Sequence, residues 1–79
     1  MTDETRFSMS YDHMTTATEA YIKLCIERST KPDCHNQEAE LNKARGALEH
    51  WRCLAINGAA PENIIDADEL RMITLIFSA

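Results

Sequence analysis

Apolar residues recur along this chain at intervals of three and four positions, a spacing that places side chains on one face of an α-helix. The first such pattern predicts a helix over residues 11–31, which ends because Pro32 cannot continue it. A charged stripe follows one side: Glu19, Lys23, Glu27 and Lys31. The predicted core side holds Met14, Ala17, Tyr21, Leu24 and Cys25, with Ile22 and Ile26 at its flank. The region is therefore an amphipathic helix that faces a core.

The start of this helix has three candidate N-caps. Residues 1–10 are polar and have no clear period, so we expect an irregular N-terminal segment. Ser8 or Ser10 can accept hydrogen bonds from the first free amides of a helix, and so can Thr16. Thr16 is followed by Glu19 three positions later, which fits a capping box.

A second helix is predicted over residues 37–56, capped by Asp33 or Asn36. Its core stripe has three-four spacing: Leu41, Ala44, Leu48, Trp51 and Ala55. Asn57 and Gly58 are typical of a left-handed C-cap. A track of small residues lies on another face: Ala39, Asn42, Gly46 and Cys53. This track either lets another backbone approach closely or contains a tolerated exposed glycine.

The third predicted helix spans residues 67–78 and is the most apolar part of the chain. Pro61 suits a short turn before it, and Asp66 with Glu69 three positions later fits a second capping box. Apolar side chains cover well over half of its circumference: Leu70, Met72, Ile73, Leu75, Ile76 and Phe77. This helix either completes a three-helix core or uses part of the arc as an interface.

Composition supports an all-α fold in a single domain that spans residues 1–79. The chain has no valine and only two glycines and two prolines, whereas β-rich domains need β-branched residues and frequent turns. The net charge is −5, which argues against binding to nucleic acid or to anionic membranes. The acidity permits docking onto a basic surface.

Cysteine usage indicates a reducing compartment. Three cysteines are an odd number, and the stretch MTDETRFSMS lacks the basic and apolar regions of a signal peptide. No apolar run approaches the roughly 20 residues that a membrane span needs. We therefore expect a cytoplasmic protein with free thiols and no membrane partner.

The chain has no strong signature of a metal site, a cofactor or catalysis. No cysteine pair has C-x2-C spacing, and Cys34 with His35 lies about 22 Å along a helix from His50 with Cys53. Whether His50 and Cys53 bind a metal with help from His13 stays open. No nucleophile elbow or phosphate-binding loop occurs, so we expect no cofactor and no enzyme activity.

These observations favour a small acidic helical module that binds a larger protein as a regulator or inhibitor. Its size and charge are typical of phage or mobile-element proteins that block a host complex. The alternatives are a homodimeric accessory or transcriptional factor, and a nucleic-acid mimic that docks on a basic site. The predicted partner-binding surface has an apolar group, Met72, Leu75 and Ile76. Beside it lies an acidic group: Glu62, Asp66, Asp68 and Glu69. Phe77 is assigned to the core.

Overall fold

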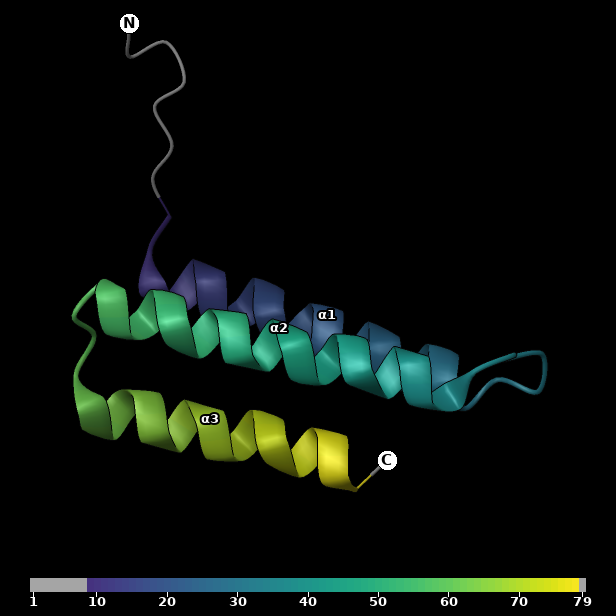
Figure 1. Ribbon diagram of the computed structural model, residues 1–79. Helices are drawn as coiled ribbons and strands as arrows, with labels where there is room; N and C mark the ends of the chain where they lie inside the picture. Colours follow the sequence, from purple (N-terminus) through teal and green to yellow (C-terminus); the bar gives the residue numbers. More distant parts are fainter. Residues whose placement is uncertain (1–8, 79) are drawn as a thin grey trace, which may run out of the picture.

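Three antiparallel helices form the part of the chain that the structure describes, residues 9–78 of a computed structural model. Helix α1 spans Tyr11–Ser29, α2 spans Gln37–Asn57 and α3 spans Glu62–Phe77, with no strand among these residues. Helices α1 and α2 form a hairpin, and α3 packs against both of them (Figure 1). The predicted all-α class is therefore confirmed. Residues 1–8, most of the predicted polar segment, lie outside the described residues.

Side-chain caps fix the starts of the first two helices. The Ser10 hydroxyl accepts a hydrogen bond from the amide of His13 at 3.0 Å, so α1 begins at Tyr11 and Thr16 lies inside the helix. The Asn36 side chain accepts from the amide of Ala39 at 3.0 Å and begins α2. Each cap satisfies one of the amides that have no partner within the helix. The capping box predicted at Thr16 is wrong.

Helix α3 begins five residues earlier than the sequence predicts, at Glu62 instead of position 67. The carbonyl of Pro61 accepts the amides of both Ile64 and Ile65 at 3.0 Å, so the helical ladder starts before Asp66. The predicted short turn and the predicted cap at Asp66 are therefore wrong. The early start matters because it brings Ile65 into the core.

The turn between α2 and α3 also differs from the prediction. Gly58 has φ −83°, whereas the left-handed residue is Ala59 with φ 61°. The amide of Ala60 reaches back to the carbonyl of Ala55 at 3.1 Å. The helix therefore winds through Asn57 and reverses one residue beyond the predicted glycine cap.

The core confirms the predicted stripe of α2 and corrects that of α1. In α2, Ala44, Leu48, Trp51 and Ala55 are buried and Leu41 is half-buried. In α1 the buried residues are Thr15, Ile22, Cys25 and Ser29. Tyr21 and Leu24, which the sequence assigned to the core, are exposed. The rotation of α1 turns Thr15 toward α2, where its hydroxyl accepts a hydrogen bond from Trp51. The buried Ser29 hydroxyl is satisfied within α1, by donating to the Ile26 carbonyl.

The glycine of the small-residue track of α2 has no other helix packed against it. A Cβ atom built on Gly46 would have no neighbour within 4 Å. Of the two interpretations of the track, the described residues therefore support the exposed glycine.

Candidate partner-binding surface

The predicted apolar contact residues lie mostly inside the molecule. Met72 is fully buried and Ile76 is 4% exposed, and both belong to the core together with Ile65. Leu75 is half-buried and packs against that core. Because residues 65, 72 and 76 fall on one face of a helix, that face turns toward the α1–α2 hairpin. Assigning Met72 and Ile76 to a contact surface is therefore wrong.

The predicted acidic group is divided between the surface and contacts with the hairpin. Glu62 and Asp66 are exposed, whereas Asp68 and Glu69 are half-buried. Arg52 of α2 donates from Nη1 to Glu69 Oε1 at 2.6 Å and lies 3.6 Å from Asp66 Oδ1. These ion pairs link α3 to α2. They involve Asp66 and Glu69, which the sequence analysis predicted to contact a partner.

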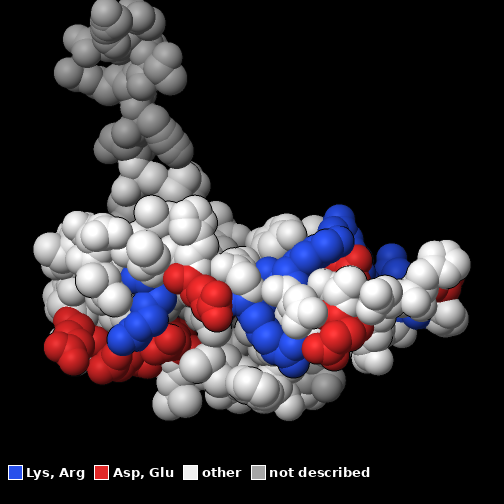
Figure 2. All heavy atoms as spheres, viewed as in Figure 1, with Lys and Arg blue, Asp and Glu red and all other residues white. Residues whose placement is uncertain are grey.

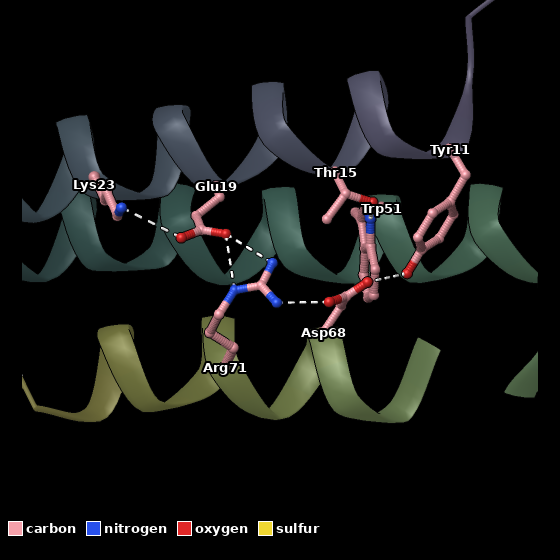
Figure 3. Close-up of polar contacts among 7 residues, drawn as sticks. All are labelled: Tyr11, Thr15, Glu19, Lys23, Trp51, Asp68 and Arg71. Atoms are coloured by element: carbon pink, nitrogen blue, oxygen red, sulfur yellow. Dashed lines mark hydrogen bonds and ion pairs between the residues drawn. The ribbon is translucent and has the colours of Figure 1, made fainter. Parts of the chain in front are cut away.

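A second polar network joins α3 to α1 through Arg71 (Figure 3). Arg71 donates from Nη1 to Asp68 Oδ1 at 2.6 Å, and from Nε and Nη2 to Glu19 Oε1 at 3.0 and 2.8 Å. Asp68 also accepts the Tyr11 hydroxyl at 2.6 Å, and Glu19 pairs with Lys23 at 3.2 Å. The network fixes how α3 is rotated on the hairpin.

These contacts shift the pKa values of the groups involved. The Tyr11 hydroxyl, followed by Arg71, lowers the pKa of Asp68. The Arg71 guanidinium, more than Lys23, lowers the pKa of Glu19. Burial, followed by the bond to Asp68, raises the pKa of Tyr11. Both carboxyls therefore stay charged near neutral pH, and we attribute a structural role to this network.

A buried polar contact lies beside this network. Trp51 donates from Nε1 to the Thr15 hydroxyl at 2.9 Å, and the Tyr11 ring lies 6.2 Å from the Trp51 ring, centroid to centroid. The indole therefore belongs to the core, as its position on the α2 stripe predicts. It is not available as an interface residue in this fold.

The opposite face of α3 is exposed and uncharged. Phe77 is 73% exposed and Leu70 is 66% exposed, which makes them the most exposed large apolar residues in the described part of the chain. They belong to a line of exposed residues spaced four, three, four and three apart: Asn63, Ala67, Leu70, Thr74 and Phe77. We call this line the α3 outer seam. Helix α3 forms the lower part of the molecule in the view of Figure 1, and Figure 2 shows acidic side chains at one end of that lower edge and uncharged atoms beyond them.

The sequence spacing could have identified the outer seam, but the apolar residues of the last helix were treated as one broad arc. That arc combines two helical stripes, one facing the hairpin and one facing outward. Phe77 was assigned to the core, but it lies on the outward stripe. A separate count of the positions that share the three-four spacing of Leu70 distinguishes the two stripes.

The histidine and cysteine pairs do not assemble into a larger cluster. Among residues 9–78, no group of three or more His, Cys, Asp or Glu side chains is arranged to hold a metal ion. Cys25 is buried, Cys34 is half-buried, and the exposed Cys53 accepts a weak hydrogen bond from Asn57 at 3.5 Å.

None of the helices within residues 9–78 has the length and apolarity needed to cross a bilayer.

Comparison with known proteins adds no relative: no family model, no curated protein and no solved structure matches this chain.

Proposed function

We propose that this chain is a protein-interaction module that binds another polypeptide through the α3 outer seam. The observation that supports this proposal is the exposure of Leu70 and Phe77 on a face without charge. Burying a leucine or phenylalanine side chain contributes about 1.5–3 kcal/mol relative to leaving it in water. Two such residues about two turns apart are the kind of anchors around which protein interfaces are built.

The rest of the fold supports this use of the seam. An amphipathic helix that places its apolar face in a groove is a common recognition mode, with anchors separated by one or two turns. The polar networks to α1 and α2 hold α3 in a fixed orientation, so less conformational entropy is lost on binding. The carboxylates of Glu62 and Asp66 flank the seam and can meet basic groups at the rim of a partner. A regulator or inhibitor would act in this way by covering a surface of a larger protein.

Nucleic-acid mimicry has less support. A mimic must present its carboxylates to the basic site that it occupies. Asp68 and Glu69 instead pair with Arg71 and Arg52 of the same chain. Asp66 also lies 3.6 Å from Arg52, so the α3 carboxylates do not form an extended free acidic face.

The test is capture of a partner with matched leucine variants. Leu70→Asp should abolish binding and leave helicity and thermal stability nearly unchanged, because the side chain is 66% exposed. Leu24→Asp is the control: the substitution is identical, and Leu24 is 40% exposed on α1. We expect a stoichiometric protein from a lysate of the native host that Leu24→Asp retains and Leu70→Asp loses. Equal retention by both variants would exclude the outer seam.

Leu75→Asp is a weaker probe of partner binding than Leu70→Asp, although the sequence places Leu75 among the contact residues. Leu75 packs against the core, so this substitution also affects folding. A loss of binding in that variant would not separate an interface from a structural effect.

A further inference from the structure

We propose that an apolar hollow at one end of the bundle binds the phenyl ring of Phe7, which belongs to the segment of this chain that precedes α1. The hollow has a volume of about 280 Å³ and lies where the start of α1, the end of α2 and the start of α3 meet. Residues 1–8 lie outside the described part of the chain. The proposal does not depend on the α3 outer seam, because no residue of the seam lines the hollow.

The hollow is lined by apolar side chains that the described residues leave open to water. Three of its lining residues are large and exposed: Met9, Leu54 and Ile64. The described lining contains no charged residue. An engineered apolar cavity of roughly 150 Å³ holds a benzene molecule, so this hollow has room for one aromatic ring. A ring placed there would remove apolar surface of all three helices from water.

The chain enters α1 along the rim of this hollow. Met9 immediately precedes the Ser10 N-cap, and Met14 is the fourth residue of the helix. These are the two positions of a hydrophobic staple, which fixes the direction in which a chain approaches a helix. Both side chains line the hollow. The start of α1 therefore brings the segment that precedes Met9 to the edge of the hollow.

Phe7 is the side chain of this segment that suits the hollow. Ser10 has extended backbone angles, φ −69° and ψ 159°. In an extended chain, side chains two positions apart point to the same side, so continuing this course through residues 7–9 places Phe7 on the side of Met9. Two extended residues span about 7 Å, which keeps the ring within reach. The other residues between positions 2 and 8 are polar or charged and do not compete for an apolar site.

The covalent connection favours Phe7 over a free ligand. Only one residue separates Phe7 from the described part of the chain, so few backbone angles have to be ordered for the contact. A short tether also gives the ring a high effective concentration at the hollow. Phe7 therefore needs less intrinsic affinity than an apolar molecule from solution.

Nuclear Overhauser effects test the contact in the full chain. The Phe7 ring protons should show cross-peaks to the methyl groups of Leu54 and Ile64. Phe7→Leu should shift those methyl signals, because it removes the ring current of the phenyl group. Phe77→Leu is the matched control: the substitution is identical, and Phe77 is exposed in the last turn of α3, whereas Ile64 lies in the first. The control should leave both methyl signals in place.

Benzene, used as a probe, tests whether the ring occupies the hollow. Phe7→Ser removes the ring and should leave the hollow open, so titration with benzene should shift the Leu54 and Ile64 methyl signals in a saturable way. In the wild type the ring already fills the space, and the same titration should shift them several-fold less. Circular dichroism should show equal helicity in both chains, because position 7 precedes the N-cap of α1. Phe7→Ala replaces Phe7→Ser if that variant loses helicity.

The outcomes decide between Phe7 and other occupants. Cross-peaks, together with methyl shifts in Phe7→Leu but not in Phe77→Leu, support the proposal. Absent cross-peaks with unchanged methyl signals in Phe7→Leu overturn it, and so do equal methyl shifts in the two leucine variants. Equal benzene binding by the wild type and Phe7→Ser also overturns it and shows that the hollow is open to another apolar group. None of these results bears on the capture experiment with Leu70→Asp, so this proposal and the proposed function fail separately.

Discussion

Replacing Thr15 with valine removes the one polar partner that the described residues give to the buried indole of Trp51. The Trp51 side chain is 1% exposed and Thr15 is 5% exposed, so water has little access to the bond between them. Valine has nearly the shape of threonine but lacks the hydroxyl that accepts the Nε1 hydrogen. The substitution therefore changes polarity at a fixed volume.

The expected cost follows from the geometry of the bond. A buried donor that loses its partner costs about 1–3 kcal/mol, because the group is desolvated without compensation. A domain of this length has a free energy of unfolding of roughly 4–12 kcal/mol. The loss is thus a large fraction of the total, and each kcal/mol should lower Tm by about 4–8 °C.

The assay is urea unfolding followed by circular dichroism in four chains: wild type, Thr15→Val, Trp51→Phe and the double variant. In the wild-type background, Thr15→Val should lower the free energy of unfolding by the amount above. In the Trp51→Phe background the indole donor is absent, and the Thr15 hydroxyl has lost the indole as its partner. There the same substitution should be neutral or stabilising, so its sign depends on the residue at position 51.

Equal destabilisation by Thr15→Val in both backgrounds would refute this reasoning. It would mean that the cost comes from packing around position 15 and not from the indole. The rotation of α1 would then need another explanation than the hydrogen bond to Trp51.

Two further predictions concern stability. Because pairing lowers the pKa of Glu19 and Asp68 below their ordinary values of 4.5 and 3.8, the unfolded chain takes up protons first. The pairing should therefore contribute its full share to the free energy of unfolding at pH values above these ordinary pKa values, and this share should be lost as the pH falls below them. Urea midpoints measured against pH should fall less steeply in Arg71→Gln than in the wild type. An identical fall in both chains would contradict the role given to the network. Gly46→Ala should raise the free energy of unfolding by about 1 kcal/mol, since alanine is the better helix former and the added Cβ meets nothing within 4 Å. A lower Tm in that variant would show that something covers this face of α2.

The class of the fold and the face of α2 could be predicted from the sequence. Both depend on local rules: a three-four spacing of apolar residues, few turn residues, and a cap at Asn36 that satisfies a free amide. The core stripe from Ala44 to Ala55 consists of apolar and small residues only, so its hydrophobic spacing identifies it. In such segments the local preference and the tertiary arrangement agree.

The orientation of α1 and α3 depends on partners that are distant in the sequence. Thr15 faces the core because an indole 36 positions away donates to it, and no local pattern distinguishes that hydroxyl from an exposed one. Large apolar residues lie on two opposite faces of α3, so periodicity cannot say which of them faces the hairpin. The hydrogen bonds that Tyr11 donates to Asp68 and that Arg71 donates to Glu19 accompany that choice. The sequence by itself determined that the last helix has more apolar surface than one core contact needs, and only the packing of α3 on the hairpin decided that Met72 is buried and Phe77 is exposed.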